Sequence, residues 1–395
     1  MTTLSEKEIQ QFRQETKGTA SVTHFNNAGA SLPPDVVLTT VINYLEDEAT
    51  MGGYEAEARH QPQLLHTYDL IAQLINADKD EIAILESASA AWTIAFNGIS
   101  FNEGDEVITC EMEYVTNLIG FLHAKKRYGL VLKVIPNDEH GDFSLSALAE
   151  AISPKTKLFA ITHIASTAGG MMPIVEIGAI ARKHGILYLL DACQSAGHVP
   201  IDVKEIGCDM LSVTGRKYLR APRGTGFLFV RKELRNQLKI VAIDGFNAEW
   251  VTTTDYKLRD DGKRFELYEK NRALTLGLGK AVEYALNIGV ERIWERIQLL
   301  SSVLRKQLDN INGVTVHDSG QQKCGIVTFS VDGVEALSIK TKLGAMKINV
   351  SVGQAKSTLY YMNKNQLTSV VRASVHYYNT EEEIGRLCNA IVGIR

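Results

Sequence analysis

Between about residues 80 and 240, short apolar runs alternate with longer amphipathic stretches. The apolar runs have the length of strands, and the amphipathic stretches repeat their apolar positions with the period of a helix. Strands that are apolar along their whole length are typical of a mostly parallel sheet with helices on both faces, because neither face meets water. We therefore predict a large, doubly wound α/β domain. The expected strands are residues 81–85, 105–110, 156–164, 186–192, 209–213 and 226–230, and the helices between them are residues 87–99, 115–129 and 174–185.

The pattern changes near residue 285, where a long helical stretch begins and is followed by short apolar segments and further helical ones. Strands and helices that alternate in this way are typical of a smaller α+β domain. We predict a large domain over residues 21–280 and a small domain formed by residues 1–20 and 281–395. The chain shows no internal repeat, low-complexity tract or flexible linker, so we expect the two domains to share an interface.

Composition and charge narrow the classes of partner. With 45% apolar and 22% charged residues, the chain has the composition of a water-soluble globular protein. A net charge of -4 offers no basic stripe for nucleic acid and no polybasic membrane anchor. The N-terminus lacks the apolar core of a signal peptide, and no stretch reaches the roughly 18 to 20 apolar residues of a membrane span. We expect a cytoplasmic protein, and the composition leaves small anionic or zwitterionic ligands open.

The five cysteines are odd in number and show no CxxC spacing. The sequence therefore predicts neither a disulfide framework nor a metal site, and most of these cysteines are expected to be small core residues.

Ligands of a doubly wound sheet bind beyond the carboxyl ends of its strands. Polar residues follow five of the expected strands, so we expect them to converge on one crevice. They are Ser87, Ser89, Tyr114, His163, Ser166, Asp191, Gln194, Thr214, Arg216 and Lys217.

Lys217 and Asp191 form the most informative pair among these residues. Lysine supplies the amine for Schiff-base chemistry, and an acid that keeps a pyridine nitrogen protonated turns pyridoxal phosphate (PLP) into an electron sink. Asp191 alone would be read as a polar residue that ends a strand and caps a turn. Since Lys217 follows one strand later, both would reach the same edge of the sheet, and the pair predicts a PLP enzyme.

A phosphate site is expected beside this pair. The small residues 87–91 open a helix, so the backbone N–H groups of Ala88 and Ser89 and the Ser89 hydroxyl could cradle an oxyanion. The alternative is that Ser87 or Ser89 is only an N-cap. Thr214 and Arg216 lie within three residues of the lysine, and arginine binds phosphate with two parallel hydrogen bonds.

Six motifs are spread over nearly the whole length of the chain. They are NNAGASLP at 26–33, EYVTN at 113–117, TH at 162–163, DACQSAG at 191–197, TGRKYLRAPRGTG at 214–226 and VRASVHYYNTEEEIGRL at 371–387. With these motifs the chain resembles the class V aminotransferase-fold PLP enzymes, the cysteine desulfurase and selenocysteine lyase group. The resemblance implies fold type I of the PLP-dependent transferases.

The resemblance also implies a role for each site residue. Lys217 holds the cofactor, Asp191 binds the pyridine nitrogen, and His163 lies near the ring as a third catalytic residue. Arg372 clamps the carboxylate of an amino acid substrate, although the residues alone would equally allow a surface arginine. The other cofactor contacts are Ala88, Ser89, Tyr114, Ser166, Gln194, Thr214 and Arg216, and the other substrate contacts are Asn27 and Ala28.

The chain also departs from the desulfurases. Those enzymes carry a nucleophilic cysteine in a loop shortly before the arginine motif, and the corresponding stretch here, residues 349–369, contains no cysteine. Ser166 and Thr167 also replace a typical asparagine, and residues 265–271 replace a Gly-Thr motif. These departures indicate another branch of the family. The combination of NNAGAS, TGRKYLRAPRGTG, FELYEKN and STLYYM before VRASVHYYNT most resembles the branch with ergothioneine-pathway C–S lyases and isopenicillin N epimerase-like proteins.

The sequence therefore favours a lyase that cleaves the C–S bond of an S-substituted or S-oxide cysteine by α,β-elimination to pyruvate and ammonia. An epimerase or aminotransferase is the alternative enzyme. A desulfurase that uses Cys324 or Cys388 comes third, and a binding subunit without catalysis is the alternative outside enzymes. The family also implies a homodimer, with Arg59, Trp250 and residues 264–272 as candidates to reach the second subunit.

Overall fold

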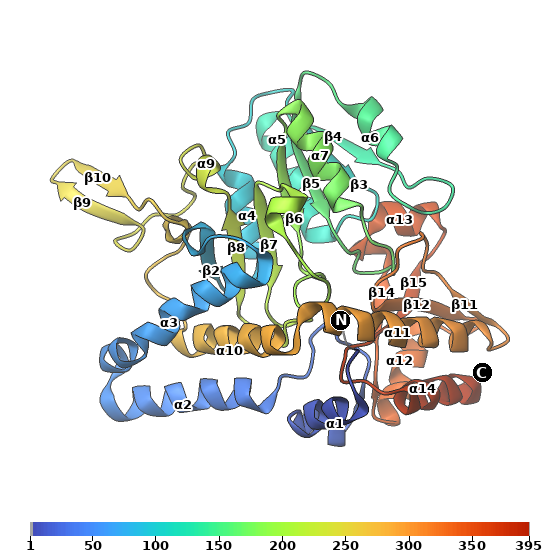
Figure 1. Cartoon of the computed structure of the whole chain (residues 1–395). Helices are drawn as coiled ribbons and strands as arrows, with labels where there is room; N and C mark the ends of the chain where they lie inside the picture. Colours follow the sequence, from blue (N-terminus) through green and yellow to red (C-terminus); the bar gives the residue numbers. More distant parts are fainter. Residues whose placement is uncertain (1–2, 395) are drawn as a thin grey trace.

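The computed structural model describes residues 3–394 and is built around a seven-stranded sheet (Figure 1). The strands follow the order β2-β8-β7-β6-β5-β3-β4, and all pairs are parallel except those that β8 forms. This is the predicted doubly wound, mostly parallel sheet. The strands are β2 (Ile82–Leu85), β3 (Glu106–Cys110), β4 (Val131–Ile135), β5 (Thr156–Thr162), β6 (Leu187–Asp191), β7 (Met210–Thr214) and β8 (Gly226–Val230).

Helices cover both faces of this sheet because neighbouring strand residues point to opposite sides. Leu158 and Ala160 of β5 belong to a core cluster with α4 (Ala88–Gly98) and α5 (Val115–Tyr128). Phe159 and Ile161 belong to the cluster on the other face. The helices that contribute to that second cluster include α3 (Gly53–Ile75), α6 (Leu145–Ala151), α7 (Ile174–His184) and α10 (Arg272–Ile288).

Strand β8 runs antiparallel to both of its neighbours. A parallel return needs a crossover of a dozen or more residues, usually with a helix, and the connection from β7 to β8 contains none. The chain therefore turns back on itself between Thr214 and Gly226, and this short turn carries Lys217.

The C-terminal part contains a second sheet in the order β11-β12-β15-β14. Helix α1 (Glu6–Gln14) shares its core cluster, and Arg13 of α1 forms a 3.0 Å ion pair with Glu383. The domain boundaries at 20 and 280 stay a prediction. The elements of this part are α11 (Val290–Asp309), β11 (Val314–Val316), β12 (Ile326–Val331), α12 (Ala336–Ala345), β13 (Ile348–Asn349), β14 (Ser351–Gln354), α13 (Leu359–Lys364), β15 (Ser369–Ser374) and α14 (Glu381–Ile394).

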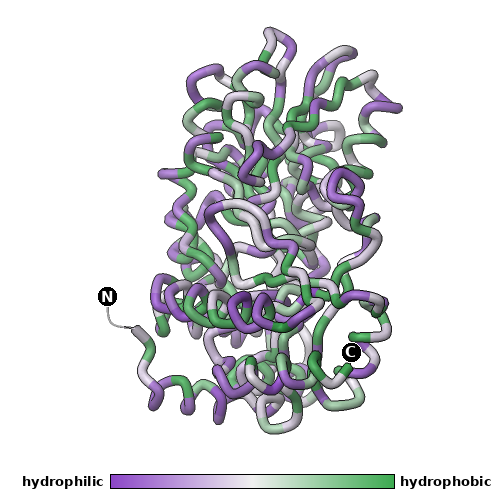
Figure 2. The backbone as a smooth tube through the Cα atoms, turned by 90° about the vertical axis from the view of Figure 1, so that its right-hand side faces the viewer, coloured by the Kyte–Doolittle hydropathy of each residue, from purple (hydrophilic) through white to green (hydrophobic). Residues whose placement is uncertain are grey.

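Two exposed parts were not predicted. Helix α2 (Asp35–Met51) pairs with α3, and the hairpin of β9 (Ala248–Thr252) and β10 (Asp255–Leu258) projects from the body (Figure 1). Hydrophobic and hydrophilic stretches interleave along the whole trace (Figure 2), and no helix within residues 3–394 is long and apolar enough to cross a membrane.

Candidate active site

Lys217 and Asp191 come together at the carboxyl edge of the large sheet. Asp191 ends β6, Lys217 follows β7, and these two strands are paired in parallel. Burial lowers the pKa of the Lys217 amine, and the guanidinium groups of Arg216 and Arg372 act in the same direction against the attraction of Asp191. The Lys217 Nζ lies 6.0 Å from the centroid of the Tyr114 ring. A lowered pKa favours the neutral amine, which is the form that acts as a nucleophile or base.

The Asp191 carboxylate is buried and held from two sides. The backbone N–H of Cys193 donates to Oδ1 at 2.9 Å, and the amide nitrogen of Asn117 donates to Oδ2 at 2.9 Å. Asp191 forms no ion pair with any lysine or arginine in the described range 3–394. An oriented carboxylate without a cationic partner suits a protonated pyridine nitrogen.

Four of the predicted residues carry buried polar atoms that have no hydrogen-bond partner among residues 3–394. Such atoms are rare in folded proteins, so they point to a polar ligand. His163 is buried, and burial lowers the pKa of its imidazole to about 4, which leaves the ring neutral. The atoms are His163 Nδ1, Ser166 Oγ, Gln194 Oε1 and Arg372 Nε. These residues fit a PLP group with an amino acid substrate.

The expected phosphate site lies where α4, β7 and β8 meet. Ser87 is the N-cap of α4 and accepts from the Ala90 N–H at 3.1 Å, so the N-cap alternative holds for Ser87. A Cβ on Gly226 would lie 2.5 Å from the Val213 carbonyl oxygen and 3.1 Å from the Ala88 nitrogen. Only glycine allows β8 to approach the start of the helix this closely.

The other phosphate candidates surround the same place. Ala88 and Ser89 form the first turn of α4, Thr214 pairs with Gly226 across β7 and β8, and Arg216 Nη1 lies 3.5 Å from Thr214 Oγ1. The helix N-terminus and the guanidinium of Arg216 both favour an anion at this point.

Arg372 brings the C-terminal part to the site. It lies on β15 opposite Ser351 of β14, and its Nη1 donates to the Ser166 carbonyl at 2.7 Å. Arg372 is half-buried and forms no ion pair with a carboxylate of residues 3–394. Its remaining donors are free to bind the carboxylate of a substrate.

Asn27 and Ala28 behave differently from the other predicted residues. The Asn27 amide is buried, donates to the Ser374 carbonyl at 2.7 Å and accepts from the Tyr378 hydroxyl at 2.5 Å. The structure therefore commits this side chain to internal bonds and does not bring it to the crevice. Ala28 does reach the site, since its carbonyl accepts from Gln194 Nε2 at 3.1 Å.

The sequence analysis gave no role to Cys193, Glu113 or Asn117. Cys193 is half-buried, and its thiol interacts electrostatically with Asp191 and Lys217. Burial, followed by the Asp191 carboxylate, raises the pKa of this thiol well above its usual value. Glu113 and Asn117 lie in the EYVTN motif on either side of Tyr114, and the Asn117 amide donates to both Glu113 and Asp191. Their place in a motif that matches the family was a signal for a role at the site, but it did not show which residues they contact.

Comparisons with known proteins agree with this geometry. The family model for aminotransferase class V matches residues 23–387. A probable cysteine desulfurase of Methanothermobacter thermautotrophicus is 31% identical over 336 residues, which cover 84% of this chain and 84% of that protein. The apo cysteine desulfurase of Thermococcus onnurineus NA1 superposes with a TM-score of 0.93 at 26% identity, over 100% of this chain and 99% of that one. The cystine C-S lyase C-DES, solved with its product cysteine persulfide, has a TM-score of 0.87 at 23% identity over 95% and 99% of the two chains, a likeness of fold alone.

Proposed function

Since the chain belongs to the class V aminotransferase family of PLP-dependent enzymes, we propose that it is a carbon–sulfur lyase. It acts on a cysteine-derived amino acid with an S-substituent or an S-oxide, and it releases pyruvate and ammonia. This assignment is closest to the C–S lyases of the ergothioneine type.

The residues of the site take the following roles. When bound, PLP supplies an aldehyde that captures the substrate amine and a ring that absorbs the electrons of the α-carbon. Arg372 binds the substrate carboxylate, and the Lys217 amine removes the α-proton. The Asp191 carboxylate accepts a hydrogen bond from the ring nitrogen. The C–S bond at the β-carbon then breaks, and the sulfur leaves with its substituent.

The distribution of the cysteines carries this proposal. Residues 349–369 contain no cysteine, and Cys324 and Cys388 are 0% and 7% exposed. Burial raises the pKa of the Cys324 thiol to about 12 and that of the Cys388 thiol to about 11, so neither is a ready thiolate. Because no cysteine of the enzyme is set up to accept the sulfur, the sulfur leaves bonded to the substituent that it carried in the substrate.

Cysteine desulfurase activity is the second candidate, because the relative from Methanothermobacter thermautotrophicus is named a probable cysteine desulfurase. Cys193 is the candidate acceptor in this case, because its thiol interacts electrostatically with Lys217. Its raised pKa opposes that role, since the thiolate is the nucleophile. Epimerase or aminotransferase activity remains the alternative when the substrate has no leaving group.

The test is an assay of pyruvate and of protein-bound persulfide with S-substituted cysteines, cysteine S-oxides and free cysteine. We expect pyruvate from wild type and from Cys193→Ala, and none from Lys217→Ala. Persulfide on wild type that disappears in Cys193→Ala would replace the lyase with the desulfurase. Solvent deuterium at the α-carbon without pyruvate would indicate an epimerase.

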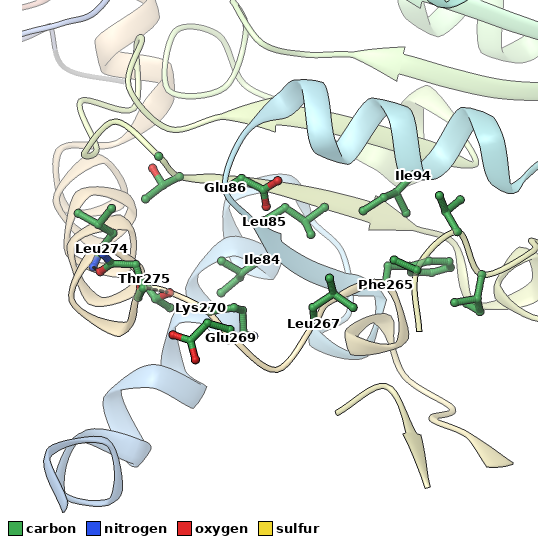
Figure 3. Close-up of a pocket in the computed structure, with 16 residues that line it drawn as sticks. Ile84, Leu85, Glu86, Ile94, Phe265, Leu267, Glu269, Lys270, Leu274 and Thr275 are labelled. Atoms are coloured by element: carbon green, nitrogen blue, oxygen red, sulfur yellow. Dashed lines mark hydrogen bonds between the residues drawn. The ribbon is translucent and has the colours of Figure 1, made fainter. Parts of the chain in front are cut away.

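We also propose a homodimer. Trp250 is 78% exposed on the projecting hairpin, and Leu267 and Tyr268 are 42% and 48% exposed in the segment 264–272. Large apolar side chains that are this exposed are common in the interfaces between subunits. Leu267 also lines a pocket beside β2 (Figure 3) together with Ile84, Ile94, Phe265 and Leu274.

Sedimentation equilibrium should give twice the mass of one chain, and Trp250→Ser with Tyr268→Ser should weaken the association. Arg59 forms an exposed 3.2 Å ion pair with Asp47. A substitution at Arg59 is a further test of the association. A monomeric wild type would contradict this assignment.

A further inference from the structure

Behind Asp191 lies a second buried carboxylate, that of Glu113. One side-chain amide connects the two: Asn117 Nδ2 donates to Asp191 Oδ2 at 2.9 Å and to Glu113 Oε1 at 2.8 Å. An NH₂ group has two hydrogens, so both are used in this contact. Asn117 lies in the first turn of α5, which fixes the amide relative to the sheet edge.

The Glu113 carboxylate is fully buried and surrounded by donors. It lies between the ends of β3 and β5 at the start of α5, where the helix N-terminus also favours negative charge. It accepts five hydrogen bonds, from Thr109 Oγ1, the Tyr114 N–H, Asn117 Nδ2, the Thr162 N–H and Thr162 Oγ1. A group that only accepts is set up as an ionised carboxylate.

Burying two carboxylates side by side costs folding free energy, and packing alone gives no reason for it. Neither Glu113 nor Asp191 forms an ion pair with a lysine or arginine of residues 3–394. Burial, together with the neighbouring Asp191 carboxylate, raises the pKa of Glu113 to about 7. Two adjacent buried anions destabilise each other unless a cation is shared between them. The protonated ring nitrogen that Asp191 is proposed to bind is such a cation.

We propose that Glu113 and Asn117 are positioning residues: Asn117 orients the Asp191 carboxylate, and Glu113 adds negative charge that keeps the pyridine nitrogen of PLP protonated. This inference rests on the role proposed for Asp191. It does not depend on which amino acid the enzyme cleaves.

The experiment is solid-state ¹⁵N NMR of holoenzyme reconstituted with PLP that carries ¹⁵N at the pyridine nitrogen. This chemical shift distinguishes the protonated from the unprotonated ring and requires no turnover. We expect a protonated signal in wild type and a shift toward the unprotonated position in Glu113→Gln and Asn117→Leu. Glu113→Asp, which keeps the charge, should retain more of the protonated signal than Glu113→Gln.

Thr109→Val is the matched control. It removes one 3.0 Å hydrogen bond to Glu113 without touching Asp191, so the wild-type signal should persist. Asn117→Ser, which also loses the contact with Asp191, replaces the leucine variant if that variant does not fold.

The variant Asp191→Asn distinguishes the role of Asp191 from the roles of Glu113 and Asn117. If Asp191→Asn shifts the signal while Glu113→Gln and both Asn117 variants keep it, the role of Glu113 and Asn117 is overturned and that of Asp191 stands. If Asp191→Asn also keeps the protonated signal, the proposed role of Asp191 fails.

Discussion

Lys217 is the residue on which the proposed chemistry depends most. In the proposed mechanism its amine both holds the cofactor and moves the α-proton, so Lys217→Ala should lower the rate of pyruvate formation by about 10²–10⁴-fold, the range for loss of a general base. The visible absorption band of the holoenzyme should also change. Lys306→Ala, an exposed lysine of α11, is the control and should behave as wild type. Wild-type turnover in Lys217→Ala would refute the assignment.

Substitutions at Arg372 test how the enzyme binds the carboxylate of the substrate. Loss of its charge-assisted hydrogen bonds costs about 1.5–3 kcal/mol, so Arg372→Gln should raise KM by about 10- to 100-fold. Arg372→Lys keeps the charge but loses the planar fork, and we expect it to recover only part of the affinity. Steady-state kinetics measure both, with Arg127→Gln on the exposed side of α5 as the control. An unchanged KM in Arg372→Gln would place the carboxylate elsewhere.

At the same scale, the residues at the strand ends could be predicted from the sequence, but the residues that hydrogen-bond to them could not. Lys217, Asp191 and Gln194 could be predicted because the position of a strand end follows from local pattern. The bond between Asn117 and Asp191 joins residues 74 positions apart and depends on how α5 meets β6, which no local pattern reports. Asn27 lies in a matching motif, yet its amide points into the interior.

At the scale of elements, the proposed phosphate site depends on the close approach of β8 to α4. Gly226→Ala places a methyl group 2.5 Å from the Val213 carbonyl oxygen, and overpacking of this kind costs about 1–3 kcal/mol. We expect a lower midpoint of thermal unfolding and weaker PLP binding, since the helix start must move. Gly385→Ala in α14, where a Cβ would meet nothing within 4 Å, should instead be neutral or slightly stabilising. Equal behaviour of the two variants would contradict this account.

All the strands and helices predicted between residues 80 and 240 are confirmed, because buried strands and amphipathic helices have strong patterns. Strand β4 was not predicted, since it lies at the sheet edge and mixes buried with exposed positions. The hairpin of β9 and β10 was not predicted either, because its side chains are mostly exposed and carry no alternation between a core face and a solvent face.

At the scale of the whole molecule, the turn with Lys217 is tied to both ends of the chain. Arg220, which is 2% exposed, donates to the Leu32 carbonyl at 2.8 Å, to Thr16 Oγ1 at 2.6 Å and to the Tyr377 hydroxyl. Its guanidinium carbon also lies 4.5 Å from the centroid of the Tyr378 ring. The position of Lys217 therefore depends on segments from the N-terminus and from the C-terminal part, which explains why one core cluster includes all three.

His198 also connects the large sheet domain to the C-terminal part. Its burial predicts how the free energy of unfolding changes at low pH. Its Nδ1 lies 2.9 Å from the Gln194 carbonyl oxygen, and the Gly325 N–H donates to Nε2 at 2.9 Å, so the folded protein holds a neutral ring. Burial lowers the pKa of His198 to about 3, whereas the unfolded chain binds a proton below about pH 6.5. The free energy of unfolding should therefore decrease as the pH falls from 6.5 toward 3, by up to about 1.4 kcal/mol per pH unit for this one group.

Urea unfolding at pH 6.5 and 4.5 measures this effect. His198→Asn retains a donor for the Gln194 carbonyl but cannot be protonated, so it should lose about 2–3 kcal/mol less than wild type between the two pH values. The other buried histidines, His24, His163 and His376, still contribute in the variant, because burial also lowers their pKa values. His123→Asn on the exposed side of α5 should keep the wild-type slope. An identical slope in His198→Asn would mean that acid destabilises the protein without protonating His198, the ring that connects the Gln194 carbonyl to the Gly325 N–H.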